Sequence, residues 1–156
     1  MSKPESHGVP SANIPSSADI TAIEVWLKRL LRFAGTVMLL AFGAVVMPTE
    51  WMEASHQRLG LGEFPTTPLV DYLTRSISML YGIYGGMYLV IARDLRRLAP
   101  VLKYMASANI VFGAAMVAID LHAGMPWYWV AGEGPSILAF AVLLLVMVHR
   151  VPQPRS

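Results

Sequence analysis

Cysteine is absent from this sequence of 156 residues, and histidine occurs only four times. Without cysteine the chain cannot form disulfides, thiolate metal sites or a redox-active dithiol. The histidines fall in the first tail, in loops or at the ends of apolar stretches. A haem held inside a membrane requires histidines within the spans, and histidine-rich membrane hydroxylases require many more of them. Both classes are therefore set aside.

Charged residues are also scarce, at 14% of the chain, whereas 55% of the residues are hydrophobic. The mean hydropathy of +0.51 is too high for an ordinary soluble fold, and the length fits a single domain. The basic residues stand beside apolar stretches, which is typical of membrane topology and not of a nucleic-acid surface. The composition predicts an integral membrane protein that contacts the lipid bilayer and binds no nucleic acid.

The stretch Asp71–Arg97 organises the rest of the prediction. Its middle, Ile77–Ala92, carries no charge and as a helix would extend roughly 24 Å, against about 30 Å for the hydrocarbon layer. On a helical wheel its glycines share one face, its tyrosines form a neighbouring stripe, and large apolar residues fill the opposite side. Small residues let another helix approach closely, so we expect one protein-facing and one lipid-facing side. The predicted packing glycines are Gly82, Gly85 and Gly86, of which the first and last form a GxxxG spacing, and Gly113 on the next span.

The first 20 residues contain several prolines and serines, which predicts a disordered cytoplasmic tail. A capping box over Thr21–Glu24 predicts that a helix begins near Ala22. Its first turns are amphipathic and suit the membrane interface, and the span proper covers Phe33–Met47. Residues 151–156 are predicted to form a second tail, which leaves residues 21–150 as the membrane domain.

Three further spans are predicted from apolar runs and helix breakers. Thr49 is expected to cap a short interfacial helix that stops at Gly60, and Thr67-Pro68 to open the second span. Pro100 is expected to open the third helix, and Pro135–Val148 is a fourth apolar run, which is short for a span unless its helix begins nearer Trp127. The predicted fold class is all-α integral membrane, a four-transmembrane-helix bundle with a short interfacial helix in the first outer loop.

The distribution of basic residues predicts the orientation. Ten of the 12 lysines and arginines fall on one side of these spans, and only Arg58 and Arg75 fall on the other. By the positive-inside rule both termini lie in the cytoplasm, and the expected location is a bacterial inner (plasma) membrane. The ten are Lys3, Lys28, Arg29, Arg32, Arg93, Arg96, Arg97, Lys103, Arg150 and Arg155.

Asp71 and Arg75 stand four residues apart at the start of the second span, on its glycine face. Residues at this spacing are neighbours on a helix, so an ion pair is predicted. The pair either fixes the depth and rotation of the helix near the outer surface, where charges can still reach water, or anchors a ligand head group or a partner subunit.

Asn109 falls in the middle of the third span. An unbonded amide is costly there, so it should face another helix, where Tyr81, Tyr84 or Tyr88 can supply a partner. The four residues then act as a hydrogen-bonded joint between helices. The alternative is a pocket for a quinone or pigment, because tyrosines stack on rings and hydrogen-bond carbonyls.

Acidic residues and histidines gather in the predicted outer loops. Glu53 and His56 have an ExxH spacing, and Asp120 and His122 could complete a mononuclear zinc or iron site. A di-iron site of the ferritin type would need a second ExxH. The short helix would have to fold back over the outer end of the third helix to bring the two histidines together. We expect instead that these side chains are solvated and do not bind a metal together.

The pattern resembles the small four-helix bacterial membrane proteins called DoxX-like. The resemblance rests on four spans of similar length, on the run Arg75…Tyr81-Gly-Ile-Tyr-Gly-Gly and on the break at Pro48, and it covers about Phe33–Val148. It implies the same fold, and some members resemble membrane partners of quinone-linked sulfur oxidation. No catalytic motif of that group can be placed on this chain, so no catalytic residue is predicted.

Three functions stand as hypotheses. The first is a non-catalytic membrane subunit that docks through its glycine faces, on other subunits or on a second copy, within a larger bacterial assembly. The second is a membrane component of a redox system that binds quinone or metal near the outer face. The third is a small oligomeric transporter, although the first span lacks the acid of four-helix drug exporters. We expect the first, without enzymatic activity.

Overall fold

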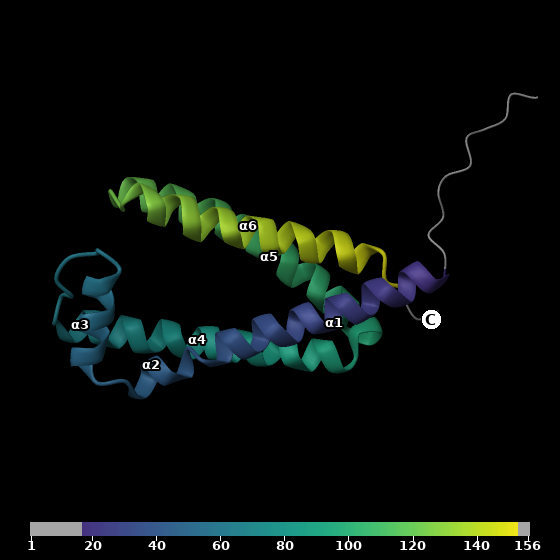
Figure 1. Ribbon diagram of the computed structural model, residues 1–156, viewed down its shortest axis with the longest axis horizontal. Coiled ribbons are helices and arrows are strands. Elements are labelled where there is room, and N and C mark those ends of the chain that lie inside the picture. Colours follow the sequence, from purple (N-terminus) through teal and green to yellow (C-terminus); the bar gives the residue numbers. More distant parts are fainter. Residues whose placement is uncertain (1–16, 153–156) are drawn as a thin grey trace, which may run out of the picture.

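The computed structural model describes residues 17–152, and every regular element in this range is an α-helix (Figure 1). The helices are α1 Ser17–Leu39, α2 Phe42–Val46, α3 Thr49–Arg58, α4 Pro68–Arg93, α5 Leu95–His122 and α6 Trp127–His149. Three segments are long and apolar enough to cross a membrane, namely Thr21–Val46, Leu95–His122 and Trp127–His149. The protein is therefore an all-α membrane protein.

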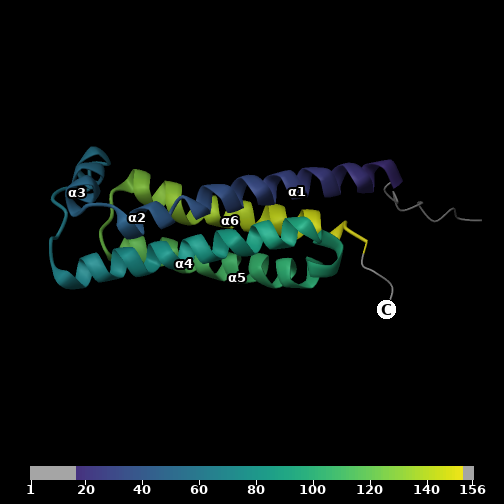
Figure 2. The same cartoon turned by 90° about the horizontal axis from the view of Figure 1, so that it is seen from below.

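The long helices form two antiparallel pairs, α1 with α4 and α5 with α6 (Figures 1 and 2). Asp94 alone separates α4 from α5. The two pairs meet at the end of the molecule that holds this turn, and they diverge toward the opposite end, where α3 lies (Figure 1). We call these the closed end and the open end.

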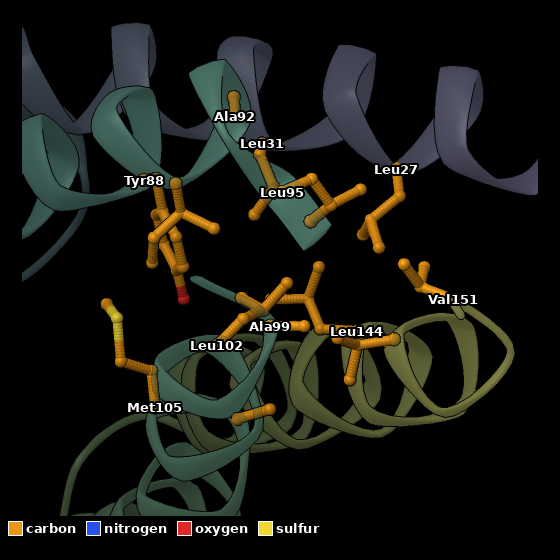
Figure 3. Close-up of a cluster of buried hydrophobic side chains, with 13 residues drawn as sticks. Leu27, Leu31, Tyr88, Ala92, Leu95, Ala99, Leu102, Met105, Leu144 and Val151 are labelled. Atoms are coloured by element: carbon orange, nitrogen blue, oxygen red, sulfur yellow. The ribbon is translucent and has the colours of Figure 1, made fainter. Parts of the chain in front are cut away.

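The hydrophobic core lies at the closed end (Figure 3). Leu31 of α1, Leu102 of α5 and Leu144 of α6 have no exposed surface and belong to one cluster with Tyr88 of α4. Val151 is in the same cluster and is 3% exposed, so it belongs to the packed domain and not to the predicted tail. All four long helices thus contribute to one core at this end.

Toward the open end, close packing occurs within each pair. Gly85 of α4 faces Gly35 of α1, and Gly134 of α6 faces Gly113 of α5. Among the described residues the core cluster that joins the two pairs reaches no further than Tyr88 on α4 and Ala106 on α5. The two pairs are therefore two well-packed layers that share a core at one end only.

Two predicted helix boundaries are confirmed. The Thr67 hydroxyl accepts a hydrogen bond from Val70 N at 3.4 Å, and Pro68 follows as the first residue of α4. Gly60 follows the end of α3 and has a positive φ of 72°, a conformation that terminates helices. At the start of α3, however, Pro48 occupies the cap position without a side-chain hydrogen bond, and Thr49 is the first helical residue.

Two predicted starts are wrong, those of the first and third helices, and the fourth helix has the earlier of the two starts considered. The first helix begins at Ser17, before Ala22, because neither proline nor glycine interrupts the chain between there and Gly35. The third begins at Leu95 and the fourth at Trp127, so that both contain a proline. A proline inside a helix removes one backbone hydrogen bond, and the tight packing of α5 on α6 outweighs that loss.

The predicted continuous span Phe33–Met47 is interrupted between α1 and α2. Leu40 N bonds Val37 O at 3.1 Å, and Gly43 N bonds Leu40 O at 2.9 Å. These three-residue spacings tighten the helix locally. The short α2 that follows ends before Pro48, so its last carbonyl groups have no partner within their own helix.

Candidate functional site

Two tyrosines of α4 and an asparagine of α5 form a hydrogen-bonded set between the two helix pairs. The Tyr84 hydroxyl donates to Asn109 Oδ1 at 3.2 Å, and Asn109 Nδ2 donates to the Tyr88 hydroxyl at 3.0 Å. The two tyrosine rings meet edge to face with centroids 5.4 Å apart, and Tyr88 meets Phe140 of α6 at 6.1 Å. The amide thus has a partner at both its oxygen and its nitrogen.

The position of this set in the fold gives it two possible roles. Tyr88 is buried in the core, whereas Tyr84 and Asn109 are only half-buried. The set therefore lies at the edge of the core, where the two pairs begin to separate. It joins α4 to α5, and it also leaves polar atoms and ring faces accessible at that edge.

Tyr81 does not join this set. Within residues 17–152 Tyr81 has no hydrogen bond or ring contact, although the carboxylate of Glu133 on α6 is near enough for its charge to act on the Tyr81 hydroxyl. The Glu133 carboxylate in turn accepts a hydrogen bond from the Trp129 indole N–H. Glu133 was predicted to lie in an outer loop, but α6 begins at Trp127 and carries it inside the helix. The early start of α6 thus places a carboxylate near α4.

Three of the four predicted packing glycines lie close to a neighbouring helix. A Cβ on Gly85 would stand 2.7 Å from Gly35 O, and one on Gly82 would stand 2.6 Å from the Phe42 ring. On α5, a Cβ on Gly113 would stand 2.9 Å from the Leu138 side chain. Gly86 differs, because nothing among the described residues lies within 4 Å of its Cβ position.

The close contact of α4 therefore runs over Gly82 and Gly85 and not over the GxxxG pair Gly82–Gly86. The physical reason is the direction from which α1 and α2 approach, since Gly85 and Gly86 point about 100° apart on the helix. These packing glycines are covered within the chain, so they are not free to dock another subunit. Gly43 and Gly132 do have open space around their Cβ positions.

Asp71 and Arg75 form the predicted ion pair, and Arg75 has a second partner. Arg75 Nε lies 3.0 Å from both carboxylate oxygens of Asp71. Its Nη1 donates to Val45 O near the end of α2. A cation at a helix C-terminus satisfies a free carbonyl and complements the helix dipole. The pair thus ties the open end of α4 to α2, a contact that depends on the interruption of the first helix.

The four proposed metal ligands lie in different surroundings, and Glu53 accepts a hydrogen bond from Gln57 Nε2 at 3.4 Å within α3. The His56 ring is held by Gly62 O at 3.2 Å and by the Phe64 ring, and His122 is exposed. Asp120 is 3% exposed, and its Oδ2 has no hydrogen-bond partner. Within residues 17–152 no group of three or more potential ligands comes together. The helix α3 does turn toward α6, where the Tyr128 hydroxyl donates to Leu59 O at 3.0 Å.

The sequence-based reasoning missed a second ion pair, at the closed end. Glu24 of α1 accepts a hydrogen bond from Arg96 Nε at 2.9 Å and is 7% exposed. Glu24 was assigned to a capping box, but the helix begins a turn and a half earlier and places it in mid-helix. The available signal was the run of arginines after α4, which needed an acidic partner on a neighbouring helix.

Comparisons with protein-family models, with curated proteins and with solved structures gave no match to this chain. The resemblance to DoxX-like proteins gains no support from them and stays a prediction. The function is therefore inferred from the contacts of this chain alone.

Proposed function

We propose that the protein is a non-catalytic integral membrane subunit that takes its place in a larger bacterial membrane assembly. The supporting observation is the separation of the two helix pairs toward the open end (Figure 1). Outside the shared core the two pairs make few contacts with each other, and a helix of a neighbouring subunit can pack against the helix surfaces that are left without a partner there. The assembly then completes the packing that this chain leaves unfinished.

We further propose that α4 is a fourth span and that α3 is interfacial. The helix α4 has 26 residues, which corresponds to roughly 39 Å. It packs antiparallel along α1, so it must cross the membrane wherever α1 does. Its charged ends, glycines and tyrosines explain why it is less apolar than the other three segments. Short α3 carries the exposed Trp51, which suits the membrane interface.

The proposed orientation has both termini and the closed end on the cytoplasmic side of an inner membrane. The described basic residues of the ten-residue set lie on segments of the closed half, including the α4–α5 turn. Arg58 and Arg75 lie near the open end. Reporter fusions after Ser156 and within residues 60–65 test this orientation. They should report opposite sides, and a periplasmic C-terminus would contradict the proposal.

The docking faces that we propose are the open glycines of the open end, Gly43 on α2 and Gly132 on α6. Because their Cβ positions meet nothing within the chain, a leucine there should leave the bundle intact and still obstruct a partner helix. We expect Gly132→Leu to fold normally and to lose proteins that co-purify from native membranes. The matched control is Leu143→Ala, which also changes an exposed apolar site on α6 but in its closed half. Equal co-purification with wild type and Gly132→Leu would contradict this docking face.

A second candidate function is a redox component that binds quinone at Tyr84 and Asn109. The observation that favours it is the accessible edge of the hydrogen-bonded set beside aromatic rings. Protein purified from native membrane without overexpression should then carry quinone, and Asn109→Leu should remove it. Quinone that is absent from the wild type, or unchanged in the variant, would exclude this candidate.

A further inference from the structure

A shallow groove lies between α4 and α5 near the closed end, with a volume of about 360 Å³. Its walls are wholly apolar. The residues of α4 that line it are Ile83, Gly86, Met87, Val90 and Ile91, and those of α5 are Leu98 and Val101. Gly86 forms its open floor, because nothing among the described residues lies within 4 Å of its Cβ position. The groove therefore has room for a slender apolar chain.

Two arginines stand at the cytoplasmic end of this groove in the proposed orientation. On α4, Arg93 follows Gly86 by seven residues and Val90 by three, so it continues the stripe that lines the groove. On α5, Arg97 precedes Val101 by four residues and lies on the same face as that residue. Both arginines are exposed.

The neighbouring Arg96 provides a contrast. Arg96 is paired with Glu24 of α1, whereas neither Arg93 nor Arg97 makes an ion pair within residues 17–152. Arg96 therefore stabilises the fold, whereas Arg93 and Arg97, which flank Asp94 in the turn, have no ion-pair partner among the described residues. Apolar walls below two unpaired cations match a molecule with an apolar chain and an anionic head.

We propose that this groove binds one anionic phospholipid, with an acyl chain over Gly86 and the phosphate head group between Arg93 and Arg97. Basic residues next to the membrane attract anionic lipid head groups, and each contributes about fivefold to binding. A second copy of the chain would bring its own arginines to the same turn, and the resulting repulsion disfavours it as the occupant. The inference is independent of the subunit function, because a lipid bound here leaves the open end free.

The test uses purified full-length protein in mild detergent, titrated with phosphatidylglycerol or with zwitterionic phosphatidylcholine and followed by native mass spectrometry. We expect one phosphatidylglycerol to bind tightly and phosphatidylcholine to bind weakly. Arg93→Gln and Arg97→Gln should each weaken phosphatidylglycerol binding about fivefold, and the double variant roughly 25-fold. Gly86→Leu should fill the groove and abolish the tight site, while thermal unfolding shows that the fold is retained.

The matched control is Arg150→Gln, which removes an equal charge at the end of α6, away from the groove. It should leave the tight site unchanged. An equal loss in this control would mean that only general surface charge attracts lipid, and it would overturn the proposal. Inorganic phosphate that competes at low concentration would reveal a simple anion site without the acyl groove. If the wild type formed a dimer and Gly86→Leu converted it to a monomer, a second copy of the chain would occupy the groove. That result would also overturn the proposal.

Discussion

The closed end and the open end of the bundle are built from the same four helices but are held together differently. At the closed end, side chains from all four helices share one core, and Glu24 and Arg96 add an ion pair between α1 and α5. At the open end, the contacts are the glycine packing within each pair, the Arg75 bond to α2 and the Tyr128 hydrogen bond to Leu59 O, and no shared core joins the two pairs there. The first arrangement joins all four helices, whereas the second joins mainly the two members of each pair.

This difference bears on which end of the protein is available to bind another molecule. In a membrane, lipid chains are as apolar as leucine, so helices associate through close packing and polar contacts more than through burial from water. The closed end has both the close packing and the polar contact within one chain. The open end has close packing within pairs but little between them, so we propose it as the part where another molecule binds.

The largest expected effect comes from Gly85→Leu, which would break the α1–α4 pair itself. A Cβ there would stand 2.7 Å from Gly35 O, and a backbone atom cannot move aside as a side chain can. We expect a loss of stability above about 3 kcal/mol, measured as thermal or detergent-induced unfolding. The adjacent Gly86→Leu should cost almost nothing. Similar losses for the two variants would contradict the assignment of α4 faces.

Leu144→Ala tests the shared core. Leu144 has no exposed surface, whereas its neighbour Leu143 is 46% exposed. Removing buried methyl groups leaves a cavity and lost contacts, which should lower the unfolding free energy by about 2 kcal/mol. Leu143→Ala should change it by less than about 0.5 kcal/mol. If both substitutions had the same effect, the core would not be where we place it.

Asn109→Leu tests the polar joint at the edge of the core. The substitution removes two hydrogen bonds, from Tyr84 and to Tyr88. Hydrogen bonds between membrane helices contribute on average about 0.6 kcal/mol each, so we expect a loss of about 1 kcal/mol in unfolding experiments. Tyr84→Phe should lose about half of that. A double variant as stable as Asn109→Leu alone would show that the two residues act through the same bond.

The smallest expected effect is that of Tyr128→Phe at the open end. It removes the hydroxyl that donates to Leu59 O, an exposed hydrogen bond that contributes about 0.5 kcal/mol. Global stability should hardly change, while amide hydrogen exchange in α3 should become faster. Faster exchange at the closed end as well would show that the two ends are more strongly coupled than we infer.

Part of this architecture could be predicted from the sequence, because its signals are local. The cap at Thr67, the stop at Gly60 and the close packing of Gly82, Gly85 and Gly113 each depend on residue type and spacing. The start of α5 at Leu95 differs from the prediction because α5 passes through Pro100, and α6 likewise passes through Pro135. Whether a helix passes through a proline depends on the packing of its neighbours, which one segment does not reveal.

In the candidate site, too, local signals could be predicted from the sequence and relations between distant segments could not. That Asn109 needs a tyrosine partner follows from the cost of an unbonded amide in a membrane, and the structure joins it to Tyr84 and Tyr88. That Tyr81 stays outside this set, and that Gly86 opens on a groove, depends on how the helices are oriented. Such relations arise between segments far apart in the chain, so helical wheels cannot supply them.

The most direct test of the account compares distances between the two pairs at both ends. Because the chain contains no cysteine, introduced cysteines can carry spin labels without background. One labelled pair joins Arg29 of α1 to Arg150 after α6, and the other joins Gly43 of α2 to Gly132 of α6. In bilayers without a partner, the closed-end pair should give the shorter and narrower distance distribution and the open-end pair the longer one. Equal distances at the two ends would mean a parallel, fully packed bundle and would contradict the account.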